Sequence, residues 1–151
     1  MVDRNNVLNE LLPFFNADPR YYLLIIDSGF GKIDQLKKLN PLRVFNAGIA
    51  EQATVSIASG MAAEGLIPII YSIASFLVFR ALEQIRINIV LRDTNVKLIG
   101  NGSGDYFKFL DECHCCRDYD EKLMKLIGMP FYTGDQFKEW LDSPKGGYLK
   151  C

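Results

Sequence analysis

Short apolar runs, bounded by polar residues or glycine, recur along the chain. The clearest covers residues 21–26, Tyr-Tyr-Leu-Leu-Ile-Ile, and is followed directly by Asp27-Ser28-Gly29. A continuous apolar run of this length is typical of a strand buried on both faces, as in a parallel sheet. Similar runs lie at residues 43–46, 67–71, 96–99, 130–132 and 148–150. We therefore predict about six strands.

Stretches with helical spacing separate these strands. Apolar residues recur at helical intervals from residue 7 to 15, and the pair Asp18-Pro19 then disfavours a helix. Further helices are predicted at residues 32–39, 51–64, 75–91, 118–127 and 135–141. The alternation predicts a single α/β domain over residues 1–151, with three α/β/α layers around a mainly parallel sheet. Ligands of such sheets bind beyond the carboxyl ends of the strands.

Composition narrows the function classes. Lysine and arginine number 17 against 18 acidic residues, so no basic field is available to hold nucleic acid or an anionic membrane. No apolar run reaches the roughly 20 residues that a membrane span needs, and residues 1–6 do not resemble a signal peptide. Three of the four cysteines lie within residues 113–116, which is a poor disulfide framework. We expect a cytoplasmic protein with reduced thiols.

The segment from Phe45 to Gly65 carries the most chemical information. Gly48 permits a sharp turn after a strand, and Glu51 then falls in the first turn of the next helix, where free backbone amides favour a carboxylate. That helix is rich in alanine, serine and glycine, which allows another backbone to approach closely. On these features alone, Glu51 is either a helix-stabilising carboxylate or an acid placed for chemistry.

The wider pattern around Glu51 resembles transketolase-like thiamine diphosphate enzymes, which include transketolase and deoxyxylulose phosphate synthase. The resemblance rests on the Gly-Ile-Ala-Glu-Gln segment at residues 48–52 and the helix after it. It also includes Pro41, Arg43, Pro68, Tyr71, residues 75–77, Arg80-Ala81, residues 84–86, Val96-Lys97 and Gly100. The resemblance implies the pyrimidine-binding domain of that family.

It also implies roles for single residues. The glutamate that matches Glu51 hydrogen-bonds N1′ of the cofactor's aminopyrimidine and promotes loss of the C2 proton from the thiazolium. Phe76 would stack on the aminopyrimidine and Phe79 would extend the same wall, although two phenylalanines at this spacing often only fill a core. Asp27 matches an acidic position near the thiazolium, and its alternative is a polar strand end or helix cap.

The only histidine lies in the cluster Cys113-His114-Cys115-Cys116. A zinc site would need a second pair of ligands elsewhere in the chain, and a redox-active Cys113-x-x-Cys116 would need a thioredoxin-like context. By resemblance, His114 and Asp118 match a Thr-His stretch and a following acid in the family's substrate channel, with Cys113 in place of the threonine. His114 is therefore a candidate for binding a sugar hydroxyl or a reacting oxygen, or else a solvated loop residue.

The family's Gly-Asp-Gly motif, which with a later asparagine holds the diphosphate and its Mg²⁺, is missing. We therefore expect a separate diphosphate-binding partner of the transketolase N-terminal type, which holds Mg²⁺ and shares thiamine diphosphate in a heterotetramer. The substrate would be a small sugar or keto acid. The alternatives are a non-catalytic binding or regulatory module that keeps the fold and the partner interface, and a zinc-dependent scaffold.

Overall fold

A parallel sheet organises the chain. The structure is a computed structural model that describes residues 2–29 and 31–151. Its strands, in chain order, are β1 (Tyr21–Ile25), β2 (Val44–Asn46), β3 (Ile67–Ile73), β4 (Lys97–Asn101), β5 (Phe131–Thr133) and β6 (Gly147–Lys150). They form a 6-stranded sheet in the order β2-β1-β3-β4-β6-β5, and each neighbouring pair is parallel. Both edge strands are short, at 3 residues each.

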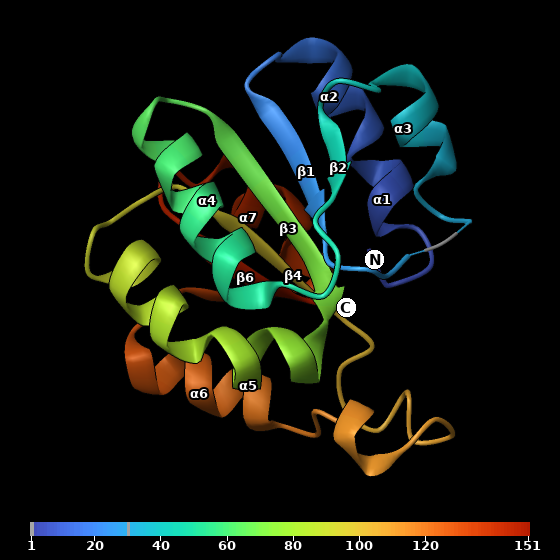
Figure 1. Ribbon diagram of the computed structural model, residues 1–151, viewed down its shortest axis with the longest axis vertical. Coiled ribbons are helices and arrows are strands. Elements are labelled where there is room, and N and C mark those ends of the chain that lie inside the picture. The colour runs from blue at the N-terminus through green and yellow to red at the C-terminus, as the bar shows by residue number, and fades with distance from the viewer. Residues whose placement is uncertain (1, 30) are drawn as a thin grey trace.

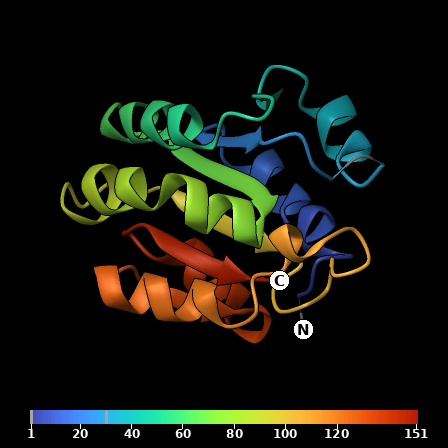
Figure 2. The ribbon, with the colours of Figure 1, turned by 60° about the horizontal axis from the view of Figure 1, so that its bottom comes forward.

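Helices cover both faces of this sheet, as Figures 1 and 2 show. On one face, α1 (Val7–Glu10), α2 (Leu12–Ala17), α3 (Asp34–Leu39) and α7 (Phe137–Asp142) enclose one hydrophobic cluster. On the other face, α4 (Glu51–Ala63), α5 (Ala74–Gln84), the π-helix η1 (Ile85–Val90) and α6 (Tyr119–Ile127) enclose a second cluster. Two short 3₁₀ turns, η2 (Glu112–His114) and η3 (Gly134–Gln136), complete the elements. The three-layer α/β/α prediction is confirmed.

Two predicted helices differ from the structure. The helix predicted at residues 7–15 is interrupted at Leu11, and α2 starts afresh with Pro13 in its first turn, where the missing N–H of proline does no harm. The helix predicted at residues 75–91 leaves helical geometry at Ala81 (φ −119°, ψ 16°) and continues as the π-helix η1. The small-residue helix α4 approaches this irregular segment closely, since the Ser59 hydroxyl donates to the Asn88 carbonyl at 2.7 Å.

Crossing a bilayer would require a longer apolar helix than any that residues 2–29 and 31–151 form.

A buried lysine lies in the middle of the sheet. Lys97 on β4 is fully buried, and its Nζ donates to the carbonyls of Ser143 and Lys145, both at 2.7 Å. Burial lowers its pKa from 10.5 to about 8.

We expect this lysine to make stability depend on pH. Because folding lowers the pKa of Lys97, the folded chain binds fewer protons than the unfolded chain between about pH 8 and 10.5. Its contribution to the free energy of unfolding therefore rises across that window, by up to roughly 3 kcal/mol, and is lost as the pH falls through 8. Urea unfolding at several pH values should show this rise in the difference between wild type and Lys97→Met.

The exposed Lys37→Met is the matched control and should leave the pH profile unchanged. Buried thiols oppose the trend, because burial raises the pKa of Cys116 to about 12, but their contribution cancels in the comparison of variant with wild type. Parallel pH profiles for wild type and Lys97→Met would contradict the prediction.

Candidate functional site

The candidate residues follow the carboxyl ends of neighbouring strands. Asp27 comes after β1, Glu51 after β2, Phe76 after β3, and His114 in the loop after β4. This edge of a parallel sheet is where α/β domains bind ligands.

The turn between β2 and α4 places Glu51. The side-chain oxygen of Asn46 accepts from the backbone N–H of Asp27 at 3.2 Å and of Gly48 at 2.9 Å. Gly48 has φ +70°, a left-handed conformation that glycine adopts without strain. Glu51 is then the first residue of α4, and only 5% of its surface is exposed. The sequence prediction of an acid at the start of this helix is confirmed, and the carboxylate lies in a water-poor position.

Glu51 is ion-paired with Arg80, which is part of the family pattern in the sequence but was not predicted as a site residue. Arg80 Nη1 donates to Glu51 Oε1 at 2.8 Å. The same guanidinium lies over the ring of Phe76, with Cζ 3.7 Å from the ring centroid. The Phe76 ring in turn contacts the His114 ring at 4.8 Å between centroids. The structure thus brings Glu51, Phe76 and His114 into one chain of contacts, with Arg80 between the acid and the aromatic ring.

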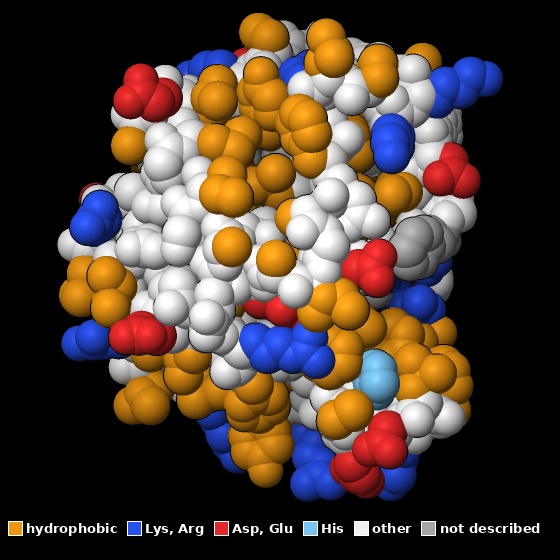
Figure 3. Space-filling model, in the orientation of Figure 1, with side chains coloured by type: hydrophobic (Ala, Val, Ile, Leu, Met, Phe, Trp, Pro, Cys, Tyr) orange, Lys and Arg blue, Asp and Glu red, His pale blue; other side chains and the backbone are white. Residues whose placement is uncertain are grey.

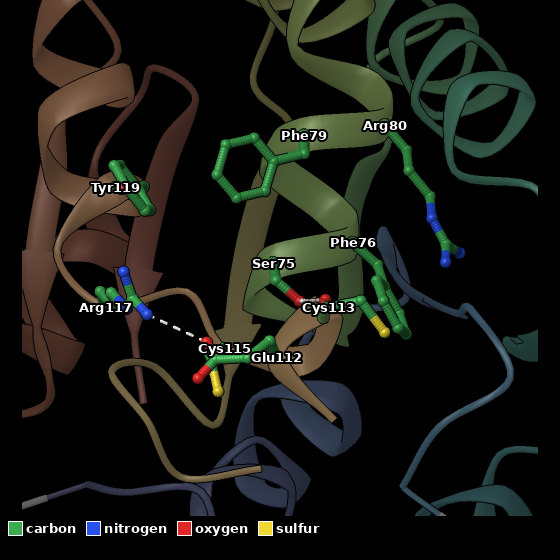
Figure 4. Close-up of a pocket in the computed structure, with 9 residues that line it drawn as sticks. All are labelled: Ser75, Phe76, Phe79, Arg80, Glu112, Cys113, Cys115, Arg117 and Tyr119. Atoms are coloured by element: carbon green, nitrogen blue, oxygen red, sulfur yellow. Dashed lines mark hydrogen bonds and ion pairs between the residues drawn. The ribbon is translucent and has the colours of Figure 1, made fainter. Parts of the chain in front are cut away.

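Phe79 lies one helical turn further along α5 and faces a hollow of about 410 Å³ between α5 and the loop after β4 (Figure 4). It contacts the ring of Tyr119 edge-on at 5.5 Å and is 53% exposed. Ser75 and Cys113 also line this hollow, and the Ser75 hydroxyl donates to the Cys113 carbonyl at 3.1 Å. Phe76 and Phe79 line this hollow together, with Phe76 turned toward Arg80 and Phe79 toward Tyr119.

Asp27 lies in a different hollow, of about 310 Å³, at the ends of β1, β3 and β4. It has a left-handed backbone (φ 40°) and an exposed side chain, and Arg4 and Lys32 line the same hollow. The hydroxyls of Ser28 and Tyr71 are buried there with no hydrogen-bond partner among the described residues. The structure therefore does not bring Asp27 into the Glu51 contacts, and it adds two cations that the sequence pattern did not indicate.

The loop that carries the cysteines and histidine, residues 102–118, is held at its base. Gly104 and Arg117 form an antiparallel bridge across it. Beside this bridge, the buried carboxylate of Asp120 accepts from the hydroxyls of Ser103 at 2.8 Å and Tyr148 at 3.4 Å, and Lys150 lies 3.7 Å away. The base of the loop is thereby tied to β6 and α6.

At the tip of this loop, Cys113 Sγ lies 3.3 Å from Nδ1 of His114. The half-buried histidine is visible in pale blue beside hydrophobic side chains in Figure 3. All four cysteines are free thiols. Residues 2–29 and 31–151 contain no group of three or more His, Cys, Asp or Glu side chains placed to hold a metal ion.

The fold and the site define a three-layer α/β domain with a buried acid and an aromatic ring at the carboxyl edge of its sheet. The model of the family "Transketolase, pyrimidine binding domain" matches residues 15–107. The chain belongs to the transketolase pyrimidine-binding-domain family. Members of this family use thiamine diphosphate, and the match includes Asp27, Glu51, Phe76 and Phe79 but ends before His114.

Individual relatives agree with this assignment. The chain is 40% identical over 83 residues to an apulose-4-phosphate transketolase subunit of Actinobacillus succinogenes, over 55% of this chain and 27% of that protein. It is 25% identical over 130 residues to the 6-deoxy-6-sulfo-D-fructose transketolase subunit SqwH of a Clostridium species, over 85% of this chain and 40% of that protein. The chain thus spans well under half the length of these curated relatives.

A solved structure described as "Split gene transketolase, inactive beta4 tetramer" superposes on this chain with a TM-score of 0.83 at 25% sequence identity. The superposition covers 97% of this chain and 49% of that one. The superposition thus extends beyond residues 15–107 to nearly the whole chain.

Proposed function

We propose that this chain is the pyrimidine-binding subunit of a thiamine diphosphate-dependent, transketolase-like enzyme. The observation that carries the proposal is the buried carboxylate of Glu51 beside the face of Phe76, with a single planar group between them. When bound, thiamine diphosphate supplies a nucleophilic carbon at which a bond next to a carbonyl is made or broken. The chain's own residues bind and orient the aminopyrimidine end.

The geometry fits an aminopyrimidine ring. The Arg80 guanidinium is flat, lies 3.7 Å from the Phe76 ring centroid and donates to Glu51 at 2.8 Å. A flat heteroaromatic ring of similar thickness in that place would stack on Phe76 and present a ring nitrogen to Glu51. Glu51, when protonated, would donate to that nitrogen, and its carboxylate would receive the proton back. Phe79 would shield the site from water, and Asp27 would lie toward the thiazolium.

The loop after β4 would face the substrate. His114 is held against Phe76 and beside the Cys113 thiol, so its imidazole could hydrogen-bond a hydroxyl or a reacting carbonyl oxygen. We propose it as a catalytic residue that binds the substrate, a small sugar or keto acid. The relatives act on sugars by their names, which supports a sugar substrate.

The proposal includes a partner chain. The sequence has no Gly-Asp-Gly motif for the diphosphate, and two relatives are named as transketolase subunits. We propose that a diphosphate-binding subunit holds Mg²⁺ and the diphosphate, and that two copies of each chain form a heterotetramer with active sites at the interfaces.

Calorimetry with a candidate partner tests this proposal. Mixing the chain with a protein that carries Gly-Asp-Gly and its asparagine should give thiamine diphosphate binding in the presence of Mg²⁺ at least ten times tighter than either chain gives alone. Replacing the aspartate of that motif in the partner by alanine should remove the gain. Equally tight binding by this chain alone would contradict the two-subunit arrangement.

A non-catalytic binding or regulatory module is the second candidate function. The ion pair between Arg80 and Glu51 favours it, because the acid is already engaged by the chain itself. The similar split-gene transketolase structure also supports this candidate, because that tetramer is described as inactive. This candidate gains if the chain binds its partner normally while the complex binds no thiamine diphosphate.

A further inference from the structure

Arg80 separates two hollows at the candidate site. One hollow, of about 410 Å³, is lined by Phe76 and Phe79 from α5 and by the loop after β4. The other, of about 550 Å³, is lined by Glu51 and its neighbours at the start of α4. Among the residues that the structure describes, Arg80 alone lines both hollows. With this side chain in place, the acid and the aromatic wall face different spaces.

The side chain is held there from both sides. Its guanidinium pairs with Glu51 at 2.8 Å and lies on the face of Phe76 at 3.7 Å. Its backbone carbonyl accepts from the side-chain amide of Gln52 at 3.0 Å, which fixes the start of α4 against α5. The next residue, Ala81, leaves helical geometry, so Arg80 stands at the kink of α5. Figure 4 shows its side chain directed away from Phe79 and toward the side of Phe76.

We propose that Arg80 is a gate for a flat heteroaromatic ring, which can bind between Phe76 and Glu51 only after the guanidinium has left. This inference rests on the proposed function and adds a conformational step to it. Movement of Arg80 would join the two hollows into one space that is bounded by Phe76, Phe79 and Glu51. The ring would replace both contacts of the guanidinium, the stacking on Phe76 and the hydrogen bond to Glu51.

The side chain is suited to such a movement. It is 42% exposed, so water can solvate the guanidinium outside the site without a change in the fold. Ion pairs and cation–π contacts at partly exposed positions are weak individually, so a ligand that forms equivalent contacts can displace them. Glu51, by contrast, is nearly buried and needs a partner in either state. The gate therefore exchanges one partner of Glu51 for another.

A probe that needs no partner chain tests the gate. The free aminopyrimidine alcohol that forms one half of thiamine carries the ring without the diphosphate, and ligand-observed NMR measures its Kd. Removal of the guanidinium in Arg80→Ala should tighten binding of this probe roughly tenfold, because the ring no longer competes with it. Arg80→Gln, which keeps a neutral donor for Glu51 and tests the idea if Arg80→Ala folds poorly, should also tighten binding. Arg86→Ala removes an exposed arginine from η1 and should leave the Kd unchanged.

A second readout follows the arginine itself. In the wild type, the side-chain protons of Arg80 should show an upfield ring-current shift from Phe76, and saturating probe should abolish it. Probe binding that leaves these signals unchanged would overturn the gate.

The outcomes separate the gate from the proposed function. If Arg80→Ala and Arg80→Gln bind the probe no more tightly than the wild type, Arg80 is not a gate, and binding by the wild type still supports the pyrimidine site. If no variant binds the probe, both the pyrimidine site and the gate are overturned. Tighter binding in the Arg80 variants together with the loss of the ring-current shift supports both.

Discussion

Glu51→Gln is expected to lower kcat of the complex with its diphosphate-binding partner by about 10² to 10⁴, the usual contribution of a positioned acid or base. Glutamine has the size and shape of glutamate, and its side-chain oxygen can still accept from Arg80, so the fold should persist. The amide cannot exchange a proton with a ring nitrogen. The measurement is turnover at saturating thiamine diphosphate, with the melting temperature recorded for each protein.

The matched control is Glu64→Gln, which makes the same chemical change at the exposed opposite end of α4. It should leave turnover unchanged. Wild-type turnover in Glu51→Gln would remove the catalytic assignment and leave the binding module as the better candidate. A loss of turnover accompanied by a large drop in melting temperature would show that Glu51 acts through the fold instead.

Asp120→Ala is expected to destabilise the chain by about 2 to 3 kcal/mol and to loosen the loop of residues 102–118. The substitution leaves the buried hydroxyls of Ser103 and Tyr148 without their acceptor. It also removes the group that joins Ser103, at the base of the loop, to Tyr148 and Lys150 on β6. Urea unfolding measures the stability. Hydrogen exchange of the Cys116 and Arg117 amides, which both donate to the Gly104 carbonyl at 2.9 Å, measures the loop.

Asp118→Ala is the control for Asp120→Ala, because both carboxylates lie at the start of α6 but Asp118 is exposed and pairs with Lys122. It should cost less than about 1 kcal/mol, as for other exposed ion pairs. Equal destabilisation by the two substitutions would assign the effect to the helix terminus rather than to the buried network.

The strands could be predicted closely from the sequence because each is a continuous apolar run. All six predictions match a strand of the sheet to within two residues at either end. The helices were predicted less well where backbone geometry departs from the side-chain pattern. Pro13 marks the start of α2 and is a signal that was present in the sequence. The kink at Ala81 and the π-helix after it have no proline or glycine to mark them in the sequence.

In the candidate site, too, local features could be predicted from the sequence, whereas a contact between distant residues could not. The position of Glu51 followed from the turn at Gly48, which is a local feature. The pairing of Glu51 with Arg80 joins residues 29 positions apart, and no local pattern indicates it. The spacing of Phe76 and Arg80, four residues apart on one helix, does place them on the same face, so their contact could have been inferred. Asp27 and Glu51 line different hollows. This separation depends on how side chains pack between the ends of two strands, and no sequence pattern predicts that packing.

The short edge strands have a consequence for how the chain can associate. An exposed strand edge can pair with strands of other chains, and a long exposed edge is a predicted site of aggregation. Here the two edge strands, β2 and β5, have three residues each. Each edge of the sheet therefore offers few backbone groups with which a strand of another chain could pair. We therefore expect a companion chain to be bound through side chains on the helices and at the strand ends. Such recognition depends on sequence, whereas strand addition would accept almost any extended peptide.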